Sequence, residues 1–432
     1  MSGLALGALL ILVMLALLAF GIPVAFSMGL SCIFFLLVTG VKPLILLAQQ
    51  SIQGIDSFVM LAIPMFTMAG YLMESGGLSK RLVDCMDKLF SRTAGGVGTV
   101  TIVCCAVFAA LTGSAPATVI AIGSIMTPAL LNAGYSKSES AGMLSAAGAL
   151  GPIIPPSICM IVYASTMNTS VVDMFAAAIV PGIFIALMLV LTNIAIAKRK
   201  RRGLDVDKLP QYTKKEILHS FLNALPVLVL PVIILGGIYG GIFTPTEAGA
   251  TALVYALILG LIYRELSVKK ILSALSKTVA SCGMVMFIMS MSADFSYLLS
   301  VGRIPTAIAN AMVPLLQSKF VFLLVMELLL LVAGCFIEVL ACVVIFGPII
   351  IPIGLQFGLD PLHLGIAFCI TLVIGVCTPP FGMNLYTAVP VCKTTFSEVC
   401  KGVLPYLVCL IVCAFAIAFI PQISLCLPAL LK

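Results

Sequence analysis

Charged and indole side chains are scarce in this chain. Its 432 residues contain no tryptophan, only two histidines and 9% charged residues, whereas 62% are hydrophobic. Soluble globular domains carry roughly 25% charged residues, so most of this surface must face lipid. Helices satisfy their own backbone hydrogen bonds in hydrocarbon. The composition therefore predicts an all-α polytopic membrane protein.

The sequence patterns of common catalytic classes are also absent. The chain has no GxxxxGK[ST], HExxH or GxSxG pattern, and two histidines are too few for a catalytic cluster. We therefore expect neither an ATP-driven pump nor an intramembrane enzyme. The fifteen cysteines lack CxxC spacing, so we expect no disulfide or zinc role for them. We expect His219 and His363, which are flanked by loop-like sequence, at the surface.

One apolar stretch, Thr112–Ala164, is interrupted twice by glycine and proline. The breaks are Gly113-Ser114-Ala115-Pro116 and Gly151-Pro152-Ile153-Ile154-Pro155-Pro156. Non-helical backbone survives at membrane depth only where it is buried in protein or lines a cavity. The apolar arms around the first break reach about 22 Å each, short of the ~30 Å hydrocarbon core, which predicts a re-entrant hairpin. We expect Pro155-Pro156 in the first turn of a new half-helix.

The second half of the chain repeats this pattern at an offset of 224 residues. The offset pairs the following residues: Gly123 with Gly347, Pro128 with Pro352, Gly134 with Gly358, Pro155-Pro156 with Pro379-Pro380, and Ala164 with Ala388. Paired interrupted segments in two halves point to the binding site of a transporter. We therefore predict two repeats, each with a re-entrant helical hairpin and a broken transmembrane helix.

The predicted organisation has two repeats, 1–197 and 217–432, joined by a basic linker, 198–216. In the first repeat, residues 1–75 form scaffold helices and 95–168 form the hairpin and broken helix. In the second repeat, 217–263 form scaffold helices and 320–392 form the hairpin and broken helix. Two mixed-charge stretches, Leu78–Arg92 and Ser267–Ser276, are predicted to be helices that lie along the membrane interface.

The distribution of basic residues predicts the orientation of the repeats. We place the linker in the cytoplasm and let each hairpin return to its own side of the membrane. Only four of the 23 Lys and Arg residues then lie outside: Lys42, Arg303, Lys319 and Lys432. This bias follows the positive-inside rule and makes the repeats inverted, the arrangement used for alternating access. Since these basic residues orient the chain, the net charge of +7 does not indicate a nucleic-acid partner.

Long segments of the chain resemble the large membrane subunit of tripartite ATP-independent periplasmic (TRAP) transporters. The similar segments span nearly the whole chain: LAIPMFTMAGYLMESGGLSKRLVD (Leu61–Asp84), TGSAPATVIAIGSIMTPALLNAGY, GPIIPPS, LPVIILGGIYGGIFTPTEAGA (Leu230–Ala250) and IGVCTPPFGMNLYTA.

The resemblance implies sodium-coupled import of a small organic anion through the bacterial inner membrane by an elevator-type mechanism. The anion would be a carboxylate, such as sialic acid or a C4-dicarboxylate, or a sulfonate. The partners implied are a small four-helix membrane subunit, expected as a separate chain, and a periplasmic substrate-binding protein. From the residues alone, an anion channel or a proton-coupled carrier of the same fold stays open as an alternative.

The resemblance also implies Na⁺ sites at the hairpin tips and broken helices. Carried over onto this sequence, the sodium residues are Gly113, Ser114, Gly148, Gly151, Gly334, Gly375, Thr378 and Phe381. The chain departs from the family pattern at the second tip, where Glu338-Val339-Leu340-Ala341 replaces an Asp followed by Pro or Thr. Backbone and hydroxyl oxygens suit hard Na⁺, although small residues such as Ser114 also serve helix packing in membranes.

Further residues are candidates for substrate binding or gating. They are Pro116, Pro155, Pro156, Ser290, Ser292, Asp294, Glu338, Pro379, Pro380 and Asn384. Acids within apolar runs are functional candidates by default, but Asp294 could also cap a helix and Glu338 could be a solvated tip carboxylate. Asn384 could serve interhelical hydrogen bonding instead. Glu247, in TPTEA, is predicted to be an acid of a helix N-terminus and not a ligand.

Overall fold

The computed structural model describes residues 3–40, 42–90, 95–199, 212–316 and 318–431, and every regular element in these ranges is a helix. Nine of the described helices are long and apolar enough to cross a membrane. These findings confirm the predicted all-α polytopic fold. Much of the basic linker, residues 200–211, lies outside the described residues.

The described residues of the first half form ten α-helices and one 3₁₀ helix. They are α1 (Gly3–Ala19), α2 (Val24–Thr39), α3 (Ile45–Gln53), η1 (Phe58–Leu61), α4 (Ala62–Ser75), α5 (Leu78–Phe90), α6 (Gly96–Thr112), α7 (Ala115–Asn132), α8 (Lys137–Gly148), α9 (Ile158–Met167) and α10 (Val171–Arg199).

In the second half, the residues that the structure describes form ten α-helices. They are α11 (Lys214–Tyr239), α12 (Pro245–Ile262), α13 (Val268–Val301), α14 (Ile304–Leu316), α15 (Lys319–Phe336), α16 (Val339–Gln356), α17 (Pro361–Gly375), α18 (Met383–Cys392), α19 (Phe396–Phe419) and α20 (Pro421–Leu431).

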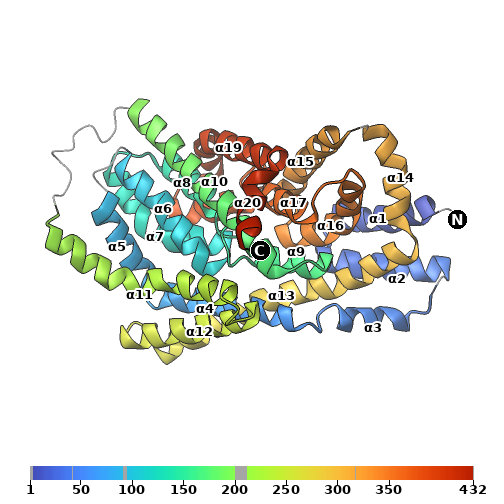
Figure 1. The fold of residues 1–432 in the computed structure, drawn as a ribbon, viewed down its shortest axis with the longest axis horizontal. Coiled ribbons are helices and arrows are strands. Elements are labelled where there is room, and N and C mark those ends of the chain that lie inside the picture. Colours follow the sequence, from blue (N-terminus) through green and yellow to red (C-terminus); the bar gives the residue numbers. More distant parts are fainter. Residues whose placement is uncertain (1–2, 41, 91–94, 200–211, 317, 432) are drawn as a thin grey trace.

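The order of helices repeats between the halves. A hairpin (α6 and α7; α15 and α16), a broken helix (α8 and α9; α17 and α18) and a long helix (α10; α19) follow one another in each. The predicted offset holds in the structure, because α7 begins at Ala115 and α16 begins at Val339, 224 positions later. In the view of Figure 1, the first hairpin (α6 and α7) lies towards the left and the second (α15 and α16) towards the right.

Two groups of helices make extensive contacts among themselves. In one group, α4 packs against α12, and the long α13 packs against α2, α3 and α4. In the other group, elements of the two halves interlock, since α18 packs against α7 and α8, α9 against α16, and α19 against α8. The second group contains both hairpins and both broken helices.

The prediction of a separate interfacial helix over Ser267–Ser276 is wrong. These residues are the capping residue and the first turns of α13, which continues without a break to Val301. Between Val268 and Gly283 the sequence contains neither glycine nor proline, so no helix-breaking residue ends α13 near Ser276. At about 1.5 Å per residue α13 is roughly 51 Å long, so its basic first turns extend beyond a hydrocarbon core of ~30 Å. The other stretch, Leu78–Arg92, is helical as α5 over Leu78–Phe90, and its place along the membrane interface stays a prediction.

His363 is not at the surface. Its side chain is buried in α17, and its ring nitrogens lie 2.8 Å from Ser424 Oγ and 3.1 Å from the carbonyl oxygen of Ala418. The reason is α20, an element that the sequence analysis missed, which packs against α17 and α10. His219 is exposed in α11, as predicted.

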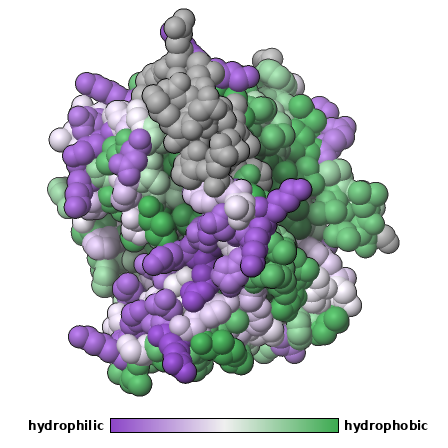
Figure 2. Space-filling model, turned by 90° about the vertical axis from the view of Figure 1, so that its left-hand side faces the viewer, coloured by the Kyte–Doolittle hydropathy of each residue, from purple (hydrophilic) through white to green (hydrophobic). Residues whose placement is uncertain are grey.

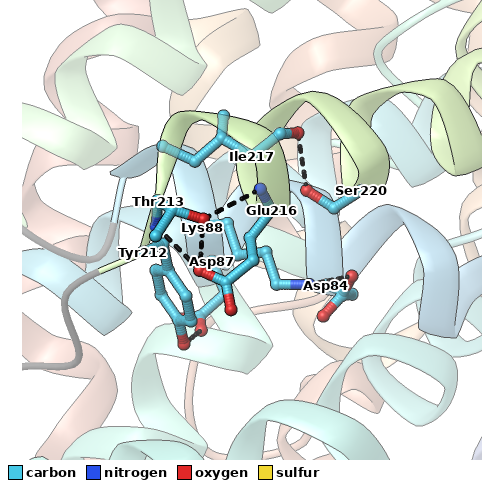
Figure 3. A network of polar contacts seen from close by, with 8 residues as sticks. All are labelled: Asp84, Asp87, Lys88, Tyr212, Thr213, Glu216, Ile217 and Ser220. Carbon is cyan, nitrogen blue, oxygen red and sulfur yellow. Dashed lines mark hydrogen bonds and ion pairs between the residues drawn. The ribbon is translucent and has the colours of Figure 1, made fainter.

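One end of the molecule carries many hydrophilic side chains, with hydrophobic side chains flanking them (Figure 2). Here α5 docks on the first turn of α11 (Figure 3). The hydroxyl of Tyr212 donates to Asp87 Oδ2 over 3.2 Å, and Lys88 pairs with Asp84 at 2.8 Å. Burial raises the pKa of the Asp87 carboxyl above its ordinary value, and the hydrogen bond from Tyr212 opposes part of that rise.

Candidate functional site

The first hairpin turns at Gly113 and Ser114, between α6 and α7. Gly113 has a φ of +61°, and a Cβ there would lie 2.7 Å from the carbonyl oxygen of Pro156. Only glycine therefore lets the tip reach the first break. Ser114 precedes α7 with extended backbone angles, and its hydroxyl makes no capping hydrogen bond. Pro116 lies in the first turn of α7, where its missing N–H leaves no helical bond unmade.

The first break runs from residue 149 to residue 157, between α8 and α9. Gly151 lies against the hairpin tip, because a Cβ there would be 2.5 Å from the carbonyl oxygen of Ser114. The half-helix α9 begins after Pro155-Pro156, with Ser157 as its cap. The prediction that these prolines form its first turn is wrong, since the Ser157 hydroxyl supplies the cap instead. The Pro155-Pro156 peptide bond is cis.

The second hairpin turns at Ile337 and Glu338, between α15 and α16. The Glu338 side chain accepts a hydrogen bond from the backbone N–H of Ala341 over 3.1 Å, so this acid caps α16. Gly334 lies inside α15, close to its end, and faces the end of α17. A Cβ on Gly375 would be only 2.7 Å from Gly334 Cα, so the two backbones are in direct contact.

The second break runs from residue 376 to residue 382, between α17 and α18. The carbonyl oxygen of Thr378 accepts from Cys335 Sγ over 3.1 Å, which ties the break to the hairpin. The Phe381 side chain is 54% exposed and its ring lies 5.3 Å from that of Phe336. The Pro379-Pro380 peptide bond is cis, like its counterpart in the first half.

Asn384 joins the two halves of the site. This side chain from α18 is fully buried, and its Nδ2 donates to the carbonyl oxygen of Ser145 in α8 over 3.2 Å. A Cβ on Gly148 would lie 3.5 Å from the same Nδ2. Asn384 Oδ1 and Ser145 Oγ are buried without a hydrogen-bond partner in the described part of the chain. Buried polar atoms are normally satisfied, so these orphaned oxygens mark a place for a bound ion or water.

The structure places three of the predicted substrate residues elsewhere, on the long helix α13. Ser290 donates to the backbone carbonyl of Ser51 in α3 over 3.0 Å, and Ser51 donates to Asp294 Oδ2 over 2.6 Å. Asp294 therefore lies in the middle of a helix and caps none. Ser292 is buried in α13. The same helix also contacts the second hairpin, because Ile288 packs with Ala341.

The donor set around the tips and breaks consists of backbone carbonyl, hydroxyl and amide oxygens, together with the Glu338 carboxylate at the second tip. Within the described ranges, no group of three or more His, Cys, Asp or Glu side chains could hold a metal ion. A hard cation such as Na⁺ suits oxygen ligands, and the orphaned Asn384 Oδ1 fits such a role. Glu247 is not part of this set, since it forms a capping box with Thr244 at the start of α12, as predicted.

One buried acid, Glu327, lies in the middle of α15 and was not among the predicted site residues. It is 0% exposed and is the only acid in the apolar run 320–337. The rule that singled out Asp294, an acid inside an apolar run, would have found Glu327 as well.

Comparison with known proteins identifies the family. The family model described as "Tripartite ATP-independent periplasmic transporter, DctM component" matches residues 11–423. The chain belongs to this TRAP transporter family. Its family relatives are permease subunits of transporters and not enzymes, in agreement with the prediction.

Two curated relatives of this DctM family chain and one solved structure illustrate the match. The chain is 39% identical to the isethionate TRAP transporter permease protein DctMQ of Oleidesulfovibrio alaskensis over 94% of its own length and 64% of that relative. It thus spans less than two thirds of that longer protein. It is 35% identical to the C4-dicarboxylate TRAP transporter large permease protein DctM of Rhodobacter capsulatus, over 97% and 98% of the two chains.

The solved structure shows a similar fold. It is the YdaH transporter of Alcanivorax borkumensis, described as having an unusual topology, with a TM-score of 0.63 and 15% sequence identity over 87% of this chain and 88% of that one. At this identity the likeness extends to the fold alone. It supports the arrangement of hairpins and broken helices described above.

Proposed function

We propose that this chain is the large permease subunit of a sodium-coupled importer for a small organic anion. One observation carries the proposal. At each hairpin, backbone atoms near the tip are in contact with backbone atoms at a helix break. Asn384 connects the two halves there, and its buried Oδ1 has no hydrogen-bond partner among the described residues. Discontinuous helices of paired repeats form the substrate and ion sites of many secondary transporters.

A bound Na⁺ would place positive charge near the anion, and the Na⁺ gradient would supply the energy for uptake. At the first tip we assign Na⁺ binding to Gly113, Ser114, Gly148 and Gly151. At the second we assign it to Gly334, Gly375, Thr378 and Phe381. The close packing of glycine backbones holds these carbonyl groups in place, and the Ser114 hydroxyl, which makes no capping bond, would be available to an ion.

The anion would dock where half-helices begin. The N-termini of α7, α9, α16 and α18 lie at the tips and breaks, and helix N-termini favour negative charge. The names of the relatives give isethionate and C4-dicarboxylates, which share an anionic group and small size. We assign gating or substrate contact to the same places, in particular to Pro116, the two proline pairs at residues 155–156 and 379–380, Glu338 and Asn384.

An elevator movement would link these sites to alternating access. The hairpins and broken helices of both halves interlock, whereas α4, α12 and α13 make their largest contacts with other helices, although α4 also touches α6 and α13 also touches α16. This arrangement supports movement of the hairpins and broken helices as one body against α4, α12 and α13. A crosslink between α7 and a scaffold helix that leaves uptake unchanged would contradict the movement.

The chain would work in the bacterial inner membrane with two partners. A separate small membrane subunit, expected to have four helices, would enlarge the scaffold. A periplasmic binding protein would deliver the anion. Exposed apolar side chains on α11, α12 and α13, such as Val232, Val254 and Val279, offer surface for lipid or for the small subunit.

Uptake into proteoliposomes tests the proposal. The chain is reconstituted with its small subunit and supplied with the binding protein and with radiolabelled isethionate, a C4-dicarboxylate or sialic acid. We expect saturable uptake of one of these anions that requires both an inward Na⁺ gradient and the binding protein. Uptake of the same size without Na⁺ would refute sodium coupling and favour the channel or a proton-coupled carrier. Vesicles without the chain control for leakage, and the Ser114→Ala protein should need a higher Na⁺ concentration for the same uptake.

A further inference from the structure

A single carboxyl group lies in the seam between α15 and α17. Glu327 is fully buried, and its Oε2 accepts a hydrogen bond from Thr371 Oγ1 over 2.7 Å. Its Oε1 is buried without a partner in the part of the chain that the structure describes. The group is therefore half satisfied, with one oxygen bonded and the other facing the packed interior.

No described cationic side chain pairs with this carboxyl group. The helices packed against α15 are α14, α16, α17 and α19. Lys319, Asp360, Glu398 and Lys401 lie at exposed helix ends, and Glu338 caps α16. His363 is bonded to Ser424 and Ala418. The other titratable groups on these helices are Cys335, Cys342, Cys369, Cys400, Tyr406, Cys409 and Cys413.

A buried carboxylate without a cation is costly, whereas a neutral carboxylic acid is not. Moving an unpaired ion from water into a protein interior costs several kcal/mol, so such a group takes up a proton instead. A proton bound at Oε2 could be donated in a hydrogen bond to Thr371 Oγ1, which lies 2.7 Å away. The local geometry thus accommodates a bound proton.

Thr371 is placed to serve both protonation states. Its hydroxyl hydrogen has two acceptors within reach, Glu327 Oε2 at 2.7 Å and the backbone carbonyl of Ala367 at 2.8 Å. When Glu327 is ionised, the hydroxyl can donate to the carboxylate. When Glu327 is protonated, the hydroxyl can turn to Ala367 and accept from the acid. A hydroxyl with two acceptors allows the proton to come and go without leaving a donor unpaired.

The repeat shows that packing alone does not require this pair. At the offset of 224 residues, Val103 stands in the place of Glu327 and Ala147 in the place of Thr371. The first half therefore builds the same seam from apolar side chains. In the second half, Thr371 lies one helical turn before Gly375, where α15 and α17 touch at the second break.

We propose that Glu327 is a proton-binding site of the second hairpin, which takes a proton from water at one stage of the transport cycle and returns it at another. An O–H bond forms at the carboxylate and an O–H bond of hydronium breaks; nothing is oxidised or reduced. The proposal rests on the proposed transport function for its place in the cycle. Proton binding itself is a property of the seam and can be measured without transport.

Infrared difference spectroscopy of the purified chain tests proton binding directly. We compare protein equilibrated in mildly acidic and mildly alkaline buffer, for the wild type and for Glu327→Gln, Thr371→Val and Asp360→Asn. We expect a protonated-carboxyl band that is lost at alkaline pH in the wild type and in the matched control Asp360→Asn, which changes an exposed acid of the neighbouring helix. We expect the band to be absent from Glu327→Gln.

Thr371→Val keeps the proposal testable if Glu327→Gln does not fold. Valine has nearly the shape of threonine but gives the carboxylate no donor, so the band should persist to higher pH than in the wild type. A band that stays constant over the whole pH range, or is unaffected by both substitutions, would overturn the proposal.

Proton flux in proteoliposomes tests the place of this proton in the cycle. A pH-sensitive dye inside the vesicles should report proton movement during Na⁺-driven uptake by the wild type and by Asp360→Asn, and its loss in Glu327→Gln. Na⁺-driven uptake by the wild type without proton movement would overturn the proton cycle and leave the proposed function intact. Absence of any Na⁺-driven uptake would refute the proposed function, and the infrared titration would still decide whether Glu327 binds a proton.

Discussion

A methyl group added at Gly375 tests whether the contact between α15 and α17 holds a sodium site. The Cβ of Gly375→Ala would lie 2.7 Å from Gly334 Cα, 2.8 Å from Gly334 C and 3.1 Å from the carbonyl oxygen of Leu331. All three atoms belong to the backbone, so no side chain can turn away. Because favourable contacts between carbon atoms lie at about 3.5 to 4.0 Å, the two helices must separate by roughly 1 Å.

The size of the effect follows from this displacement. Overpacking of a tight contact costs about 1 to 3 kcal/mol. If that strain falls on the sodium-bound state, the Na⁺ concentration for half-maximal uptake rises roughly 5- to 150-fold. Thermal unfolding in detergent should also occur at lower temperature, because the same contact stabilises the folded chain.

Gly283→Ala is the matched control for this substitution. Gly283 lies inside α13, and nothing lies within 4 Å of a Cβ built there. Alanine should stabilise that helix by at most about 1 kcal/mol. The assay is Na⁺-dependent uptake together with thermal unfolding for both variants. An unchanged Na⁺ response in Gly375→Ala, or equal damage in both variants, would refute the assignment of the seam as a sodium site.

Three further outcomes follow from the described contacts. Ser114→Ala should raise the Na⁺ concentration needed for uptake and leave the unfolding temperature unchanged, because the Ser114 hydroxyl makes no capping bond; an unaltered Na⁺ titration removes Ser114 from the site. Thr244→Ala should destabilise the chain by about 1 kcal/mol in thermal unfolding, because it removes the cap of α12, and should not change the Na⁺ response. Burial raises the pKa of Asp87, so its contribution to stability is greatest below the ordinary carboxyl pKa and is lost as pH rises towards the raised value. Asp87→Asn should therefore be at least as stable as the wild type at neutral pH and show a weaker loss of stability between acidic and neutral pH; a wild-type pH profile in this variant would contradict the burial argument.

Much of the fold was predictable because the signals are local. Apolar runs gave the spans, and glycine with proline gave both breaks. The 224-residue offset gave the repeat, which α7 and α16 then confirmed at their first residues. The pattern Thr-x-x-Glu predicted the cap at Glu247. Short helices such as α3, α14 and α20 were missed, since their 9, 13 and 11 residues are far fewer than the roughly 20 of a membrane span.

The candidate site was predictable in its segments but not in its contacts. The sequence indicated the tips at Gly113-Ser114 and near Glu338, and it did not indicate that Asn384 reaches Ser145 across the two halves. The burial of His363 depends on α20, which follows it by some sixty residues in the chain. The partners of Ser290 and Asp294 in α3 are likewise distant in sequence.

The amino-acid sequence by itself determined that this protein is helical, lies in a membrane and is built twice, because hydrophobicity and backbone breaks act over a few neighbouring residues. The tertiary structure alone decided which broken segments touch and which polar groups are left without partners. Glu327 shows the difference. In the sequence it is one acid in an apolar run, and only the packing of α17 against α15 buries it, gives it the Thr371 hydroxyl and leaves its Oε1 unbonded.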